Sequence, residues 1–155
     1  RMEGPRCSAS VTLDFRHMVD GDRRGLAAFN GHSGLLTIVR DGKSYKLVQS
    51  NTLVHLTDRE KAITGVDEDV VEQVDLKKCK KIQLRIDGDF TPGKDIATFY
   101  YKIGKGEWTP IGEPFKMQFD YRRLFMGTRY AIFNYATKQA GGYVDVDSFD
   151  YSREE

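Results

Sequence analysis

The sequence predicts an all-β protein, an antiparallel β-sandwich of the jelly-roll type, and three observations carry that prediction. Apolar and polar residues alternate with a period of two along most of the chain, as they do in half-buried strands. Turn-forming pairs such as Asp41-Gly42 recur at short spacing between the alternating segments. No segment of helical periodicity is long enough to separate the strands, which favours an antiparallel sandwich over a parallel sheet.

The expected strands can be placed in order along the chain. Near the N-terminus, Ala9, Val11, Leu13 and Phe15 alternate with polar or acidic residues. Asp41-Gly42 should close a hairpin with a type I′ turn, which needs positive φ at both central positions. Strands are expected at 9–15, 25–29, 35–39, 45–48, 70–76, 81–86, 96–103, 129–136 and 143–151. Further turns are expected at 20–22, 87–88, 104–106 and 141–142.

One stretch offers a helix start, since Thr57 and Glu60 have the spacing of a capping box. Gly65 should end that helix within two turns, so it would only decorate the sandwich. With 155 residues and 17.7 kDa, the chain is expected to form one domain over residues 1–155. No apolar run approaches the roughly 18 residues that a membrane span requires.

The charge balance and the aromatic content limit the functions that the chain can have. Lys and Arg total 24 against 23 Asp and Glu, a net charge of +1 that argues against a nucleic-acid binder. The chain has 9 Phe, 8 Tyr and 1 Trp, and a core alone would be expected to favour Phe over Tyr. Some rings should therefore meet solvent or a ligand. Those assigned to the core are Phe15, Phe29, Phe99, Phe133 and Phe149.

No motif for catalysis is present. The sequence lacks the nucleophile elbow, the zinc-protease pair of histidines and the phosphate-binding loop. Asp145 and Asp147 share one parity of the last strand, so they could supply oxygen ligands to a structural Ca²⁺, although ordinary surface acids are the favoured interpretation. No other cofactor is expected.

The cysteines and the basic run have plain interpretations. Cys7 and Cys79 can form one disulfide or stay as free thiols, and free thiols are favoured because Cys is often buried. The basic run at 77–81 has no adjacent aromatic residue, so we interpret it as a solvated strand entry that blunts a sheet edge. The chain begins at Arg1 without a signal peptide, which is typical of an excised fragment or processed product.

Several segments resemble the C-terminal concanavalin A-like β-sandwich domain of family 43 glycoside hydrolases, the β-xylosidase and arabinofuranosidase group. They follow one another in the expected order along nearly the whole chain. They are GPRCSASVTLD at 4–14, DGDRRGLAAF at 20–29, ATFYY at 97–101, WTPIG at 108–112 and, the most specific, IFNYATKQAGGYVDVDSF at 132–149. The resemblance implies a non-catalytic accessory domain without the family's catalytic acids. It also implies secretion or display at the cell surface if the whole protein degrades polysaccharide.

Two functions follow as expectations. The first is a carbohydrate-binding module that recognises plant hemicellulose, a xylan-type polysaccharide or oligosaccharide, by ring stacking and hydrogen bonds. Its binding residues would be the rings near turns and strand ends with one amide partner, namely Tyr100, Trp108, Tyr121, Asn134 and Tyr135. The second is a structural domain that packs against a catalytic five-bladed propeller, helps to shape its active site and exposes a contiguous apolar patch when isolated. Neither function involves nucleic acid or a membrane.

Overall fold

The fold is seen in a computed structural model that describes residues 1–57, 62–77, 79–118 and 127–154. Every regular element in this part of the chain is a strand, and no helix there is long and apolar enough to cross a membrane. The strands are β1 (Arg6–Asp14), β2 (Asp22–Phe29), β3 (His32–Asp41), β4 (Ser44–Leu56), β5 (Ile63–Asp75), β6 (Lys81–Asp89), β7 (Ile96–Lys102), β8 (Thr109–Pro110), β9 (Phe115–Lys116), β10 (Arg129–Ala136) and β11 (Asp145–Arg153).

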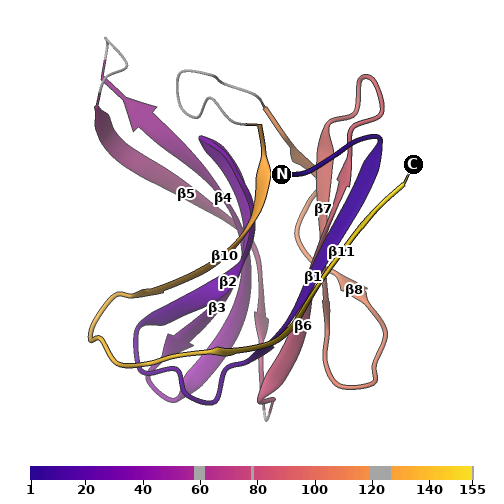
Figure 1. The fold of residues 1–155 in the computed structure, drawn as a ribbon. Helices are drawn as coiled ribbons and strands as arrows, with labels where there is room; N and C mark the ends of the chain where they lie inside the picture. The colour runs from indigo at the N-terminus through magenta and orange to yellow at the C-terminus, as the bar shows by residue number, and fades with distance from the viewer. Residues whose placement is uncertain (58–61, 78, 119–126, 155) are drawn as a thin grey trace.

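The strands form two antiparallel sheets that face each other, so the predicted all-β sandwich is confirmed (Figure 1). The first sheet has the order β11-β1-β6-β7-β8, and β9 also pairs with β7. The second sheet has the order β10-β2-β3-β4-β5. Strands β10 and β11 are each an edge strand of their sheet, and they lie on the same side of the sandwich (Figure 1).

The core lies between the sheets and follows the predicted alternation. In β1, Ala9, Val11 and Leu13 are buried, whereas the residues between them are only half-buried. A Cβ on Gly34 would lie 2.5 Å from the ring of Phe99, so this glycine lets the opposite sheet approach closely. Buried residues from both sheets form one hydrophobic cluster between the sheets.

The Asp41-Gly42 hairpin is confirmed, but its turn differs from the expected type I′. Asp41 pairs with Ser44, so Gly42 and Lys43 are the central residues. Only Gly42 has positive φ, at 61°. A positive φ at the first central position alone is the pattern of a type II′ turn, which also suits the twist of a hairpin. The dipeptide therefore predicted the hairpin correctly and the turn position one residue too early.

Two other local predictions are wrong. Residues 87–88 do not form a turn, because Gly88 continues β6 and pairs with both Cys7 and Ala97. The basic run does not blunt a sheet edge, because β6 lies between β1 and β7 in the first sheet. Of the expected short helix, residues 58–61 lie outside the described part of the chain, and Gly65 belongs to β5.

Both cysteines are free thiols, as favoured from the sequence. Cys7 is buried and its Sγ lies 3.3 Å from the hydroxyl of Tyr130. The Cys79 thiol donates to the carbonyl of Lys81 at 2.9 Å, and burial raises its pKa. The described thiols are thus packed or hydrogen-bonded within the fold.

The last strand differs from the sequence prediction because it contains a bulge. The register between β1 and β11 shifts between Thr12 and Leu13, so Val146 and Phe149 both pair with buried core residues although their parities differ. Asp147 lies in the bulge and forms an ion pair with Lys81, with Oδ2 and Nζ 2.8 Å apart. Among the described residues, no three His, Cys, Asp or Glu side chains are grouped so as to hold a metal ion.

Candidate functional site

Two of the expected sugar-binding rings lie together on the outer face of the first sheet. Tyr100 on β7 pairs across the sheet with Arg85 on β6, and Trp108 follows the turn that leads to β8. The guanidinium carbon of Arg85 lies 4.2 Å from the centre of the Tyr100 ring and 4.7 Å from that of Trp108. Both rings are half-buried. The structure thus brings Tyr100 and Trp108 into one cluster around a cation.

Cations occupy ring surface that a sugar would need for stacking. Arg85 lies over both rings, and the Nζ of Lys102 lies 5.2 Å from the Trp108 ring centre. Arg85 is held in turn by Asp87, whose Oδ1 is 3.1 Å from its Nε. Cation–π contacts of this kind contribute about 0.5–2 kcal/mol each. A ligand stacking on these faces would have to displace the cations.

The remaining expected residues do not join this cluster. Asn134 and Tyr135 are neighbours on β10, so their side chains point to opposite sides of the second sheet. Asn134 pairs with Arg24, whose side chain lies in the interior, whereas Tyr135 lies on the outer face near Phe133, with ring centres 6.1 Å apart. Tyr121 lies outside the described residues.

Exposed apolar side chains gather instead along β10 and β11, a location that sequence reasoning did not predict. We call Ile132, Val146, Phe149 and Tyr151 the β10–β11 apolar edge. Each pairs across its sheet with a fully buried residue, and such pairs share a face, yet each exposes 42–47% of its surface. The pairs are Ile132 with Leu26, Val146 with Leu13, Phe149 with Val11 and Tyr151 with Ala9.

These residues therefore face inward by register and remain open to solvent because nothing in the described chain covers that side of the sandwich. The sandwich does close at one point along this edge, where the rings of Tyr130 and Tyr151 meet edge to face with centres 6.1 Å apart. Burial raises the pKa of the Tyr130 hydroxyl well above its ordinary value, so this contact stays neutral. The core assignments of Phe29 and Phe149 are wrong, since each is 47% exposed. That of Phe133 is wrong because its ring lies beside Tyr135 on the outer face of the second sheet.

A second apolar feature adjoins this edge on the outer face of the second sheet. It is a hollow of about 260 Å³ lined by Ala27, Phe29, Leu35, Ala131, Phe133 and Tyr135. Strand β10 carries residues of both features, its odd-numbered side chains lining the hollow and Ile132 belonging to the edge. The exposed apolar surface thus continues around β10 from the outer face to the rim of the core.

A buried ion pair fixes the loop that leads into β11. Arg24 donates to the Oδ2 of Asp22 at 3.1 Å and to the carbonyl of Gly142 at 2.7 Å. Both side chains are almost fully buried, and burial lowers the pKa of the Arg24 guanidinium. Asp22 also accepts from the amide of Val19 at 2.9 Å. The pair therefore ties the loop before β11 to β2 and to the segment that precedes β2.

The chain is similar to known proteins in sequence and in fold. Residues 1–152 match the family described as the β-xylosidase C-terminal concanavalin A-like domain. The chain belongs to this family. Its resemblance to the accessory sandwich of family 43 glycoside hydrolases is thereby confirmed. A search of curated proteins gives no match to the chain.

Two solved structures resemble this concanavalin A-like domain in both sequence and fold. One is a bifunctional GH43-CE protein of Bacteroides eggerthii, with 32% identity, a TM-score of 0.84 and coverage of 100% of this chain and 18% of that one. The other is an engineered GH43 glycoside hydrolase described as having endo-xylanase and exo-arabinofuranosidase activity. It has 30% identity, a TM-score of 0.85 and coverage of 97% of this chain and 30% of that one.

A xylan β-1,4-xylosidase from Bacillus halodurans shares the fold at lower identity, 17%, with a TM-score of 0.68 and coverage of 97% of this chain and 28% of that one. In each case the domain corresponds to less than a third of the relative's length.

Proposed function

We propose that this chain is a non-catalytic accessory domain that packs against the catalytic domain of a family 43 glycoside hydrolase through the β10–β11 apolar edge. The observation that carries the proposal is the set of inward-facing side chains on that edge that nothing in the described chain covers. Contiguous exposed apolar surface on a folded domain is typical of an interaction site. The relatives add support, because their chains are more than three times longer than the region matched here.

The alternative is a carbohydrate-binding module for xylan-type hemicellulose, and the observation that favours it is the pairing of Tyr100 with Trp108 around Arg85. The same observation counts against it, since the cations cover ring surface. The other expected binding residues that are described, Asn134 and Tyr135, lie on a strand of the opposite sheet. Docking is therefore the function that the arrangement supports better.

A chimera tests the docking directly. This chain replaces the matching region of the Bacteroides eggerthii protein, and calorimetry follows thermal unfolding. We expect the chain and the catalytic domain to unfold in a single cooperative transition. Phe149→Lys should split that transition, because burying an unpaired ammonium group at an interface costs several kcal/mol. Ile132→Lys should have the same effect. Agreement between the two variants would show that the split does not come from local misfolding around Phe149.

The matched control is Val70→Lys, which places the same charge at a side chain 51% exposed on β5, the opposite end of the second sheet. The control should leave the single transition intact. Two separate transitions in the unsubstituted chimera, or equal effects of Phe149→Lys and Val70→Lys, would overturn the docking proposal.

Isothermal titration of the isolated chain with neutral xylo-oligosaccharides separates the two functions. The docking proposal predicts no saturable heat. Saturable binding that is lost in both Tyr100→Ala and Trp108→Ala, while the thermal midpoint holds, would favour the carbohydrate-binding module instead.

A further inference from the structure

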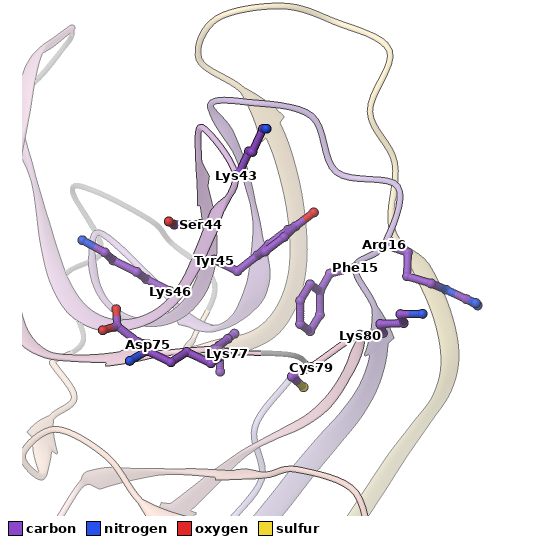
Figure 2. Close-up of a pocket in the computed structure, with 11 residues that line it drawn as sticks. Phe15, Arg16, Lys43, Ser44, Tyr45, Lys46, Asp75, Lys77, Cys79 and Lys80 are labelled. Atoms are coloured by element: carbon purple, nitrogen blue, oxygen red, sulfur yellow. The ribbon is translucent and has the colours of Figure 1, made fainter.

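We propose that a cavity at one end of the sandwich binds a carboxylate-bearing saccharide, a uronic acid unit of a polysaccharide. The cavity has a volume of about 810 Å³ and lies between the β3–β4 hairpin, the connection from β5 to β6 and the segment after β1 (Figure 2). This volume falls within the roughly 300–1,000 Å³ of ordinary small-ligand sites. It is distinct from the β10–β11 apolar edge, none of whose residues line it.

The walls of the cavity are fixed by backbone hydrogen bonds between distant segments. The amide of Phe15 donates to the carbonyl of Lys80 at 2.9 Å, and the amide of Leu76 donates to the carbonyl of Tyr45 at 2.9 Å. The rings of Phe15 and Tyr45 pack with centres 5.1 Å apart in the middle of the site (Figure 2). The cavity is thus preformed. Phe15 and Leu76 are almost fully buried behind its wall, so the half-buried ring of Tyr45, with the guanidinium carbon of Arg40 5.5 Å from its centre, offers the accessible aromatic surface.

Positive charge surrounds this aromatic surface. The lining includes Lys43 and Lys46 of the β3–β4 hairpin and Lys77 and Lys80 of the connection from β5 to β6, on different sides of the opening (Figure 2). Among the described residues, no carboxylate forms an ion pair with any of these lysines. Asp75 is the one acidic side chain among the described lining residues.

Two acidic side chains near the cavity, Asp14 and Asp147, already form ion pairs with other cations. The carboxylate of Asp14 accepts from the Nε of Arg16 at 2.9 and 3.0 Å, and Asp147 pairs with Lys81. Burial raises the pKa of the Cys79 thiol, so that lining group stays neutral and does not repel an anion. Asp75, the cross-strand partner of Lys46, offsets one of the four lysine charges, so the cavity keeps a net positive field in a chain whose net charge is only +1.

This combination selects an anion with an apolar face. A carboxylate forms charge-assisted hydrogen bonds with lysine ammonium groups, and a sugar ring offers C–H groups to an aromatic wall. An inorganic anion would leave most of the volume and the aromatic surface unused. The choice of a saccharide over another organic anion rests on the proposed function as part of a glycoside hydrolase.

Titration calorimetry of the isolated chain tests the site with three probes. Xylo-oligosaccharide carrying a glucuronic acid branch and trigalacturonic acid stand for the two sources of uronate, and unbranched xylo-oligosaccharide is the neutral control. We expect saturable binding of at least one uronate probe and none of the neutral probe. Binding should weaken between about 0.01 M and about 0.1 M salt, over which the Debye length falls from about 30 Å to about 10 Å.

The double variant Lys43→Ser with Lys80→Ser should weaken uronate binding roughly tenfold or more, because it removes two charged donors. The matched control, Lys94→Ser with Lys105→Ser, removes the same charge from the exposed turns beside β7 and should leave binding unchanged.

Equal loss in the two double variants would overturn the proposal, as would the absence of uronate binding. Equal binding of polyglutamate or of a single-stranded oligonucleotide would also overturn it, since that result describes an unselective cationic patch. The docking proposal is unaffected by these outcomes, because its chimera test measures domain coupling and not ligand binding.

Discussion

Gly142 lies where no side chain fits. An added Cβ would lie 1.9 Å from the Oδ2 of Asp22 and 2.8 Å from the amide nitrogen of Val19. The Gly142 carbonyl also accepts a hydrogen bond from the buried Arg24. The absence of a side chain at this residue therefore lets the loop before β11 dock onto the buried ion pair.

Gly142→Ala should lower the free energy of unfolding by about 1–3 kcal/mol, because the new methyl group must displace backbone and a buried carboxylate. Urea denaturation of the isolated chain measures the change. Gly127→Ala is the control, since a Cβ there meets no atom of the described residues within 4 Å. Similar values for the two variants would show that the loop is not held as described.

The stability of the fold depends on pH through the ion pair of Asp14 with Arg16. The Asp14 side chain is 3% exposed and paired with Arg16, and the hydrogen bonds from that guanidinium hold the pKa of the Asp14 carboxyl below its usual value. The pKa of Asp14 is lower in the folded chain than in the unfolded chain. The ion pair therefore contributes its full stabilisation of the fold above the unfolded pKa of about 3.9, and this stabilisation is lost as the pH falls through the folded pKa.

Asp14→Asn should accordingly destabilise the chain at neutral pH, and the difference from the unsubstituted chain should shrink below about pH 4. Urea denaturation at a series of pH values measures this difference. Asp150→Asn, on an exposed carboxylate of β11, should change little at any pH. A difference for Asp14→Asn that stays constant with pH would contradict this role of the ion pair.

At the scale of elements, β6, β7 and the turn to β8 are joined by side chains on their outer face. Arg85 reaches from β6 over Tyr100 and Trp108, so it connects the central strand to the short hairpin beyond it. Because Trp108 is the single tryptophan of the chain, its fluorescence reports on this contact.

Arg85→Ala should lower the free energy of unfolding by about 1–3 kcal/mol through loss of the two cation–π contacts. It should also make Trp108 more accessible to acrylamide quenching. Lys105→Ala, in the exposed turn beyond β7, serves as the control. Unchanged quenching in Arg85→Ala would indicate that the guanidinium does not cover the indole in solution.

The sequence predicts most of the strands because a buried face imposes a period of two, as β1 and β6 demonstrate. Its errors arise where an element depends on distant partners. Gly88 follows an aspartate as turn glycines often do, but pairing on both sides keeps it in β6. The bulge in β11 appears only in its register with β1, whereas strict alternation places residues 146 and 149 on opposite faces.

The candidate sites were harder to predict for the same reason. Alternation shows that Tyr100 and Trp108 fall near a hairpin, but only the strand order shows that Arg85 lies between them. Phe149 looks like a core residue in sequence, since nothing local reveals that one side of the sandwich is uncovered, and nothing local reveals that Phe29 lies on the outer face of its sheet. The lysines around the cavity come from the β3–β4 hairpin and from the connection between β5 and β6, so their convergence depends on the whole fold.

At the scale of the whole molecule, the two ends and two sides of the sandwich carry different surfaces. Apolar side chains line the β10–β11 apolar edge, whereas lysines surround the cavity between the β3–β4 hairpin and the start of β6. The lysines at the cavity can stay hydrated while the β10–β11 apolar edge is buried against another domain. This separation means that the proposed docking at the edge would leave the cavity open to a ligand.

Amide hydrogen exchange tests the docking account most directly, because it locates the covered surface. Exchange is compared between the isolated chain and the chimera with the Bacteroides eggerthii catalytic domain. The account predicts slower exchange in the chimera for residues 129–136 and 145–153, with little change at residues 96–110. Unchanged exchange along β10 and β11, or slowing confined to the Tyr100 and Trp108 surface, would contradict it.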